Sequence, residues 1–125
     1  MKIEVSNGEL VDKVSILSIK LENIKNENKL TNIKKEYDLL LQKMELLNIT
    51  VDSEEFNELQ SVNRELWEIE DKIRIKEAKQ QFDDEFIQLA RSVYFKNDIR
   101  FEIKKKINAK TDSFLAEEKE YVKYK

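Results

Sequence analysis

The sequence contains no cysteine, no histidine and no proline, and it has a single glycine. Without cysteine the chain forms no disulfide, has no thiolate nucleophile and cannot build a zinc–thiolate site. Without histidine it lacks the commonest general base and the commonest metal ligand of proteins. Proline and glycine are the residues that break helices, so their scarcity permits long uninterrupted helices.

The net charge is small, and long apolar runs are lacking as well. The 23 basic and 26 acidic residues leave a net charge of −3, which gives no electrostatic reason to expect nucleic acid or an anionic membrane as a partner. No apolar run approaches the roughly 20 residues that cross a bilayer, and the first residues show no signal-peptide pattern. We therefore expect a cytoplasmic protein that forms one domain over residues 1–125.

Charge and helical periodicity are abundant. Charged residues make up 39% of the chain and apolar residues 40%, a balance that suits long helices with one face in water. Apolar residues recur in steps of three and four, which predicts helices near 6–26, 29–47, 53–80 and 83–110. The short turns between them favour an all-α, antiparallel bundle with coiled-coil-like packing. A short extended lead-in, or a short strand, precedes it over 1–5, and a C-terminal tail follows it.

Three of the expected helices begin with a capping pattern. Ser6, Asp52 and Asp83 are each placed to accept an amide of the first turn, with an apolar staple around them. The polar stretch 26–29 predicts a turn. The segment 111–121 suits a short fifth helix. Four of the tail's side chains are candidates to dock on the bundle: Phe114, Leu115, Tyr121 and Tyr124.

Two helices also carry apolar residues opposite their main stripe. These are Ile16 and Ile19 in the first helix, and Leu39 and Leu46 in the second. A helix that is apolar on both faces is covered on both sides or meets a partner. Either a neighbouring segment covers these residues or the chain forms a homodimer, and we favour the homodimer because two-fold dimers are the commonest oligomers.

Charged side chains interrupt the apolar stripes of the third and fourth helices. On a helical wheel Glu77 falls inside the third stripe, and Arg100 aligns with the fourth. Because an unpaired buried charge is costly, we expect acids of the third helix to face bases of the fourth in a polar layer. The candidate ligand-binding residues of this layer and its edges are Lys13, Lys20, Glu70, Arg74, Glu77, Arg91, Tyr94, Asn97, Asp98 and Arg100.

Three interpretations of this layer are open. It is an ion-pair layer that fixes helix register, or a pocket for a small anionic ligand, whose carboxylate or phosphate the planar fork of arginine matches. The third is a carboxylate site for magnesium, which the lack of histidine disfavours; we expect no metal and no cofactor. The basic run 104–106 lies near a helix C-terminus, where cations offset the helix dipole.

Three motifs carry a resemblance that covers most of the chain. They are S-N-G-E-L-x-D-K at 6–13, W-x-I-E-D-x-I-R at 67–74 and L-A-R-S-V-Y-x-x-N-D at 89–98. The chain resembles a family of small, uncharacterised bacterial all-helical proteins, a domain of unknown function. The resemblance implies no activity and no catalytic roles. The sequence departs from the family pattern near Thr111–Ser113, where a glycine-containing turn is usual.

The function predicted from these features is that of a helical interaction or accessory module whose charged layer binds a small anionic ligand. The alternative is a small-molecule enzyme, cofactor-free or magnesium-dependent, that acts on a sugar phosphate or nucleotide. Solvent access to Glu77 and Arg100 separates the two. A closed, fully paired layer argues against the enzyme, and an open cleft with unpaired basic groups supports it.

Overall fold

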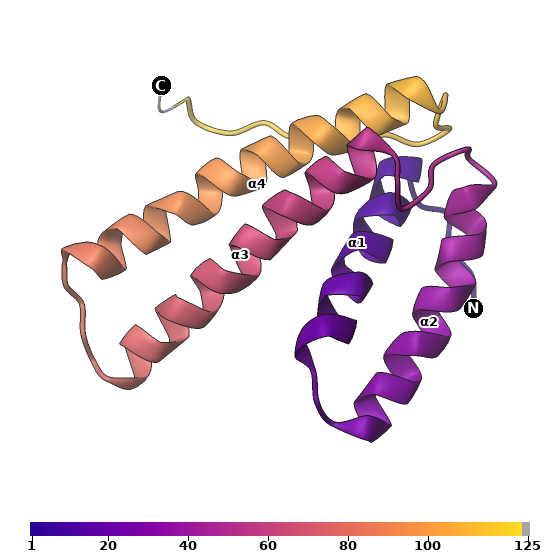
Figure 1. Cartoon of the computed structure of the whole chain (residues 1–125). Coiled ribbons are helices and arrows are strands. Elements are labelled where there is room, and N and C mark those ends of the chain that lie inside the picture. Colours follow the sequence, from indigo (N-terminus) through magenta and orange to yellow (C-terminus); the bar gives the residue numbers. More distant parts are fainter. Residues whose placement is uncertain (124–125) are drawn as a thin grey trace.

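Four helices joined by short connections make up the computed structural model, which describes residues 1–123 (Figure 1). The helices are α1 (Asn7–Asn23), α2 (Glu27–Glu45), α3 (Glu54–Ala78) and α4 (Asp84–Lys110). The prediction of an all-α fold with four helices is confirmed. Residues 1–5 form an extended lead-in and no strand.

Local capping chemistry explains most of the helix starts. The Ser6 hydroxyl accepts the amide of Glu9 at 3.2 Å, and the Asp83 carboxylate accepts the amide of Phe86 at 2.9 Å, as predicted. The cap predicted at Asp52 is wrong. The residue at the cap of α3 is Ser53, whose hydroxyl accepts the amide of Thr50 at 2.9 Å and so closes the preceding loop.

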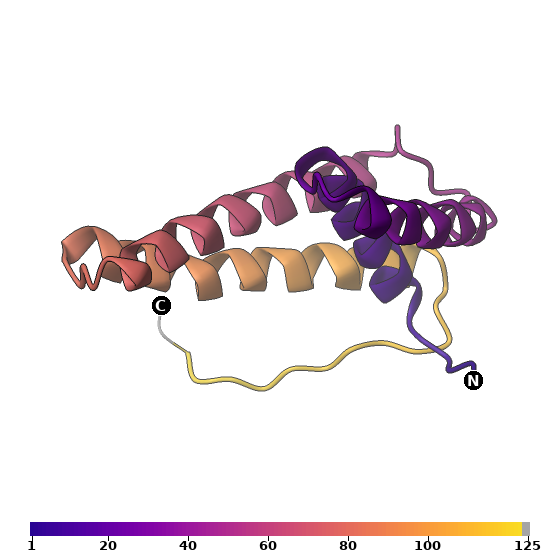
Figure 2. The same ribbon diagram turned by 90° about the horizontal axis from the view of Figure 1, so that it is seen from below.

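The helices form two antiparallel hairpins that meet at one end and diverge at the other (Figure 1). α1 joins the two hairpins, because it packs against α3 and α4 as well as against α2. In the described part of the chain α2 packs against α1 alone. In a regular four-helix bundle each helix has two neighbours along its length. Here the second hairpin instead projects away from the first (Figure 2).

The hydrophobic core lies where the hairpins meet. Buried side chains of all four helices and of the α2–α3 connection form one cluster: Val11, Val14, Met44, Ile49, Phe56, Leu59, Val62, Ile103 and Ile107. We call this end of the molecule the base. The second apolar face of α1 is covered here, since Ile19 is only 2% exposed, whereas Leu39 and Leu46 on α2 are 56% and 79% exposed. A neighbouring helix therefore covers α1, and nothing in the described chain covers that face of α2.

The projecting part of the second hairpin has a different character. We call residues 67–99 the arm; it comprises the C-terminal half of α3, the N-terminal part of α4 and the loop between them. No residue of the arm is buried. Its large apolar side chains are half-buried at best, and Ile75, Phe82 and Ile87 are at least half exposed. The arm is thus held by one seam between two helices, without a core of its own.

The tail after α4 turns back and runs along that helix without secondary structure (Figure 2). The fifth helix predicted over 111–121 is therefore wrong. Phe114 is 88% exposed and Tyr121 is 50% exposed, so neither docks as expected. Tyr124, also expected to dock, lies outside the described residues. No helix of the described chain combines the length and apolar character needed to cross a membrane.

Candidate functional site

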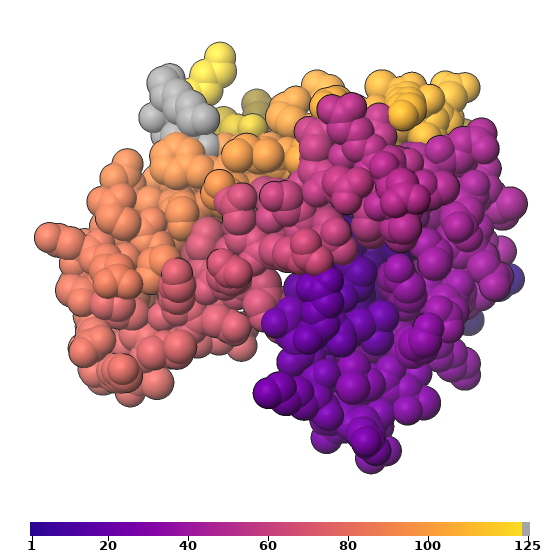
Figure 3. All heavy atoms as spheres, viewed as in Figure 1, coloured from indigo at the N-terminus to yellow at the C-terminus, as the bar shows by residue number. Residues whose placement is uncertain are grey.

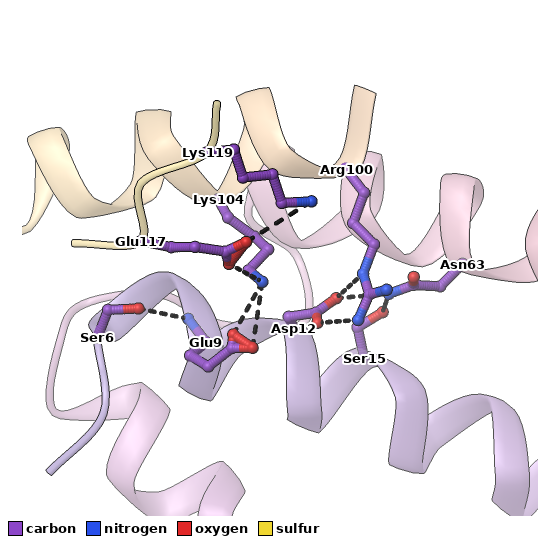
Figure 4. Close-up of polar contacts among 9 residues, drawn as sticks. All are labelled: Ser6, Glu9, Asp12, Ser15, Asn63, Arg100, Lys104, Glu117 and Lys119. Atoms are coloured by element: carbon purple, nitrogen blue, oxygen red, sulfur yellow. Dashed lines mark hydrogen bonds and ion pairs between the residues drawn. The ribbon is translucent and has the colours of Figure 1, made fainter. Parts of the chain in front are cut away.

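A buried carboxylate lies at the centre of the polar contacts in the base. Asp12 of α1 is 2% exposed and receives the guanidinium of Arg100 in a two-point contact, with the Arg100 Nε at 3.0 Å from Oδ1 (Figure 4). Asn63 of α3 donates to the same oxygen at 2.9 Å and to the hydroxyl of Ser15 at 3.0 Å. Three helices therefore converge on Asp12, and its charge is paired and hydrogen-bonded as burial demands.

The partner of Arg100 differs from the prediction. We expected Glu70 or Glu77 of α3 to face Arg100, but those two side chains are exposed on the arm and Arg100 pairs with Asp12 of α1 instead. The prediction for Glu70 and Glu77 is therefore wrong, although other acids of α3 do face bases of α4, as in the pairs Glu65–Lys96 and Glu55–Lys110. A polar layer does exist, and it lies between α1 and α4. The hydrogen bond that Arg100 donates to Asp12 raises the pKa of the guanidinium further, which keeps Arg100 charged.

The spacing of polar residues in α1 and α4 does indicate the contact of Asp12, although the helical wheels of α3 and α4 do not. Asp12, Ser15 and Ile19 recur at i, i+3 and i+7 and so share the second buried face of α1. On α4, Arg100, Lys104 and Asn108 recur at four-residue steps, which places three long polar side chains on one line. Taken together, these two lines of polar side chains indicate a contact between α1 and α4.

A second ion-pair group ties the tail to the base. Lys104, only 6% exposed, lies with its Nζ 2.8 Å from a carboxylate oxygen of Glu9 and 2.8 Å from one of Glu117 in the tail (Figure 4). Burial alone lowers the pKa of Lys104, but the hydrogen bonds to Glu117 and Glu9 outweigh it and the pKa is raised. The same contact lowers the pKa of Glu117. Lys104, the first residue of the basic run 104–106, is therefore a buried member of an ion-pair group.

The N-terminus of α1 is closed by α4 and the tail. The amide of Gly8 donates to Asn108 at 2.7 Å, and the amide of Asn7 donates to the hydroxyl of Ser113 at 2.9 Å. A Cβ at position 8 would lie 2.6 Å from the carbonyl oxygen of Lys104. Glycine is therefore required for the close approach of α1 to α4, and the amides that an anion would use at this helix end are occupied.

Two of the predicted ligand residues line one cavity beside the polar layer. Lys13 and Arg100 border a cavity of about 730 Å³ between α1, α2 and the lead-in. Its walls combine apolar side chains of the lead-in and of both helices with carboxylates that include Glu36, which lies 3.9 Å from Lys13. The cavity therefore has two cations on a largely apolar surface, and each of them is paired with a carboxylate of the same wall, Arg100 with Asp12 and Lys13 with Glu36. Lys20, further along α1, is half-buried and does not border it.

Three other predicted residues line a cavity between α4 and the tail. Tyr94, Asn97 and Asp98 border a volume of about 520 Å³, closed on the other side by Lys119 and Tyr121. Lys119 also lies over the ring of Phe101, with 5.2 Å from its Nζ to the ring centroid, and beside Glu117 at 3.7 Å. The tail thus forms one wall of this cavity. Arg91, one turn away from Tyr94, is exposed.

The three predicted residues of α3 lie on the arm, away from both cavities. Glu70, Arg74 and Glu77 are exposed, and within residues 1–123 their side chains have no hydrogen-bond or ion-pair partner. No three carboxylates among the described residues come together in a way that would hold a metal ion. The structure therefore divides the ten predicted residues among the base, the tail cavity and the arm, and does not gather them in one site.

The family of the chain follows from comparison with known proteins. No curated protein and no solved structure matches it significantly. A family model, however, matches residues 1–124, nearly the whole length. That coverage includes the three motifs noted in the sequence, which the structure distributes over the start of α1, the arm on α3 and the arm on α4. The chain belongs to DUF6165, a family of unknown function.

Proposed function

We propose that the protein is a non-catalytic helical interaction module, in which the base is a rigid support and the arm presents the binding surface. One observation carries the proposal: no side chain between residues 67 and 99 is buried, although the arm contains a tryptophan, aromatic residues and two charged motifs. Surfaces that combine exposed apolar side chains with charged ones are typical of protein-binding sites.

The charged side chains of the arm add to this support. Glu70, Arg74 and Glu77 contribute nothing to the fold through ion pairs within the described chain. Charges at the edge of an interface select the partner and its orientation more than they add affinity. A charged strip beside half-buried Trp67 therefore has the composition of a recognition surface, with an aromatic anchor next to orienting charges.

Site-specific photo-crosslinking in cells tests this proposal. A photo-reactive amino acid replaces Ala78, which is exposed on the arm, and a control chain carries it at exposed Lys35 on α2. We expect a defined crosslinked protein with the arm position and none with the control position. Equal labelling at both positions, or no product at the arm, would contradict the proposal. Fractionation of the same cells tests the expected cytoplasmic location.

A small anionic ligand in the cavity of the base is a second proposal, and the position of two cations supports it. Lys13 and Arg100 come from different helices and border the same cavity of about 730 Å³. Arg100 is held by Asp12, so Lys13, whose contact with Glu36 is 3.9 Å long, is the cation that is more available to an anion. Its apolar walls favour an anion with an apolar portion, because such walls bury apolar ligand surface. The enzyme alternative receives less support, since Arg100 and Lys104 are both engaged by carboxylates of the chain itself.

A thermal-shift screen of phosphorylated and carboxylated metabolites, with and without magnesium, tests ligand binding. A ligand that binds only the folded state raises the apparent melting temperature by mass action. We expect the shift to disappear in Lys13→Gln and to persist in Lys34→Gln, whose lysine is exposed on α2. If no compound moves the melting temperature, or if both variants respond alike, the cavity is not the site.

A further inference from the structure

One face of α3 packs against α1 near the base and is exposed to solvent further along the helix. Near the base, Gln60 and Asn63 project toward α1, with Gln60 donating to Ser18 at 2.9 Å and Asn63 to Ser15 at 3.0 Å. Seven residues further along a helix the same face recurs. The positions that continue this face into the arm are Trp67, Glu70, Arg74 and Glu77. Beyond Trp67 this face no longer lies beside α1, so the strip formed by Trp67, Glu70, Arg74 and Glu77 is uncovered there.

The uncovered strip borders a hollow between the two hairpins. Figure 3 shows the hollow between the arm and α1. At its closed end lies a pocket of about 260 Å³ lined by Ile19 and Glu22 of α1 and by Arg64, Trp67 and Glu68 of α3. Along one wall runs α3 with its unpartnered charges. The hollow is thus open to another element that enters between the hairpins.

The order of charges along α3 is self-complementary. On the strip itself the acidic Glu70 precedes the basic Arg74, and Glu77 follows; Lys72, Lys76 and Lys79 lie on other faces of the helix at 100° per residue. Lys76 is engaged within the chain, 2.7 Å from Asp83. If a second α3 lies antiparallel to the first, the acidic part of each copy faces the basic part of the other. A parallel arrangement would oppose like charges, which is unfavourable.

We infer that the occupant of this hollow is the arm of a second copy of the chain, in a two-fold dimer with antiparallel α3 helices. With the two-fold axis near Lys72, Glu70 of each copy faces Arg74 of the other, and Glu77 of each reaches the neighbourhood of the other's Trp67. A two-fold interface repeats every contact, so each pair counts twice.

The arms carry little net charge, which removes one source of repulsion between two copies. Residues 67–99 hold eight acidic and six basic side chains. No large charge of one sign therefore opposes the approach of two identical arms. The inference rests on the proposal that the arm is the interaction surface, and it names the partner of that surface.

Charge reversal tests the inference on the full-length protein. Sedimentation equilibrium should give twice the chain mass of 15.0 kDa for the unmodified protein. Glu70→Arg alone or Arg74→Glu alone places like charges opposite each other at two sites, and each should weaken the dimer at least about tenfold. An equimolar mixture of the two variants should associate again, and so should the double variant Glu70→Arg/Arg74→Glu.

Two controls make the test specific. Reversal of the exposed Lys34–Asp38 pair on α2, one charge at a time, should leave the dimer intact, since that pair is remote from the arm. Circular dichroism of every variant checks that the helices still form. Because complementary variants should rescue each other, a variant that merely unfolds is recognised by its failure to regain association in the mixture.

Two results would overturn the inference. One is a monomer mass for the unmodified protein up to its highest soluble concentration. The other is a dimer that neither single reversal weakens, which would place the two-fold contact elsewhere. If the protein is monomeric but the photo-crosslinker on the arm captures a different protein, the second-copy inference fails and the proposed interaction function stands. If both experiments are negative, both proposals fail.

Discussion

At the scale of single residues, Gly8 and Asp12 determine how α1 meets α4. Gly8 is the only residue small enough to lie against the backbone of α4 at Lys104. Asp12 is a buried carboxylate that needs partners from α3 and α4. Both positions are decided by contacts about 90 to 100 residues away in the chain, since Asp12 binds Arg100 and Gly8 binds Asn108. Substitutions at this junction should therefore be costly in ways that can be measured separately.

Gly8→Ala should destabilise the protein although alanine is the better helix former. Helix propensity favours alanine by about 1 kcal/mol, but the new methyl group would lie 2.6 Å from the Lys104 carbonyl oxygen. Overpacking against backbone costs about 1–3 kcal/mol. Urea denaturation should show a net loss of stability, whereas the exposed Ser61→Ala on α3 should change little. A Gly8→Ala protein as stable as the parent would contradict the required close approach.

Arg100→Gln should be far more costly than the matched change Arg64→Gln. Arg100 neutralises Asp12, which is 2% exposed, so its loss leaves a buried carboxylate without its charge partner at about 3 kcal/mol. Arg64 pairs with Glu22 at an exposed site, where such pairs contribute about 0–1 kcal/mol. Equilibrium unfolding of the two variants measures the difference.

A double variant identifies the cause. Asp12→Asn combined with Arg100→Gln removes both charges and should regain part of the stability lost by Arg100→Gln alone, because contacting residues are energetically coupled. Equal losses for Arg100→Gln and Arg64→Gln, or no coupling in the double variant, would show that the buried pair does not carry this junction.

At the scale of elements, the tail depends on ionic contacts. Glu117 reaches buried Lys104 at 2.8 Å, while the aromatic and apolar residues of the tail stay largely exposed. A segment held by few buried apolar contacts opens at low free energy. The tail also closes one wall of the cavity at Tyr94 and Asn97, so its attachment governs access to that cavity.

Acidification should release the tail. The hydrogen bond with Lys104 lowers the pKa of Glu117 in the folded protein, so this contact adds stability above the ordinary glutamate pKa of about 4.3 and loses it as the pH falls through the lower folded value. The raised pKa of Lys104 keeps its contribution complete until strongly alkaline pH.

Glu117→Gln provides the measurement of this effect. The variant should show a smaller loss of stability between neutral and acidic pH than the unmodified chain, and faster tail amide exchange at neutral pH. Glu118→Gln, one residue further along the tail and exposed, is the matched control. An identical pH dependence for the Glu117 variant and the unmodified chain would exclude the ion pair as the attachment.

The capping pattern shows how far sequence alone can predict elements. Ser6 and Asp83 cap their helices as predicted because a cap is a contact with an amide three residues away. Asp52 does not, since the loop before α3 uses Ser53 to satisfy the amide of Thr50. The segment 111–121 is predicted to be helical, but an ion pair of Glu117 with Lys104 of α4 and a hydrogen bond from Asn7 of α1 to Ser113 attach it without a helix. Local chemistry predicts the ends of helices well, except where residues from another part of the chain form competing hydrogen bonds or ion pairs.

At the scale of the whole molecule, the protein has a packed base and an arm without a core. All nine residues of the main hydrophobic cluster lie in the base, and residues 67–99 contribute none. Opening of the arm therefore exposes little additional apolar surface, and its free energy should be well below that of global unfolding.

Amide hydrogen exchange should separate these two parts. In dilute protein the amides of the arm should exchange much faster than those around Val14, Leu59 and Ile107 in the base. If the arms pair between copies, protection of the arm should rise with protein concentration while that of the base stays constant. Uniform protection along the chain at all concentrations would contradict the division into base and arm.

The sequence by itself determined the helices of this protein and not the arrangement of its charges. Scarce proline and glycine, apolar steps of three and four, and nearby caps are local features, so they predict four helices with nearly correct ends. Which charge is buried depends on register between helices far apart in the chain. A wheel places Glu77 inside a stripe, yet only the divergence of the hairpins leaves it in water, and only the packing of α1 on α4 brings Asp12 to Arg100.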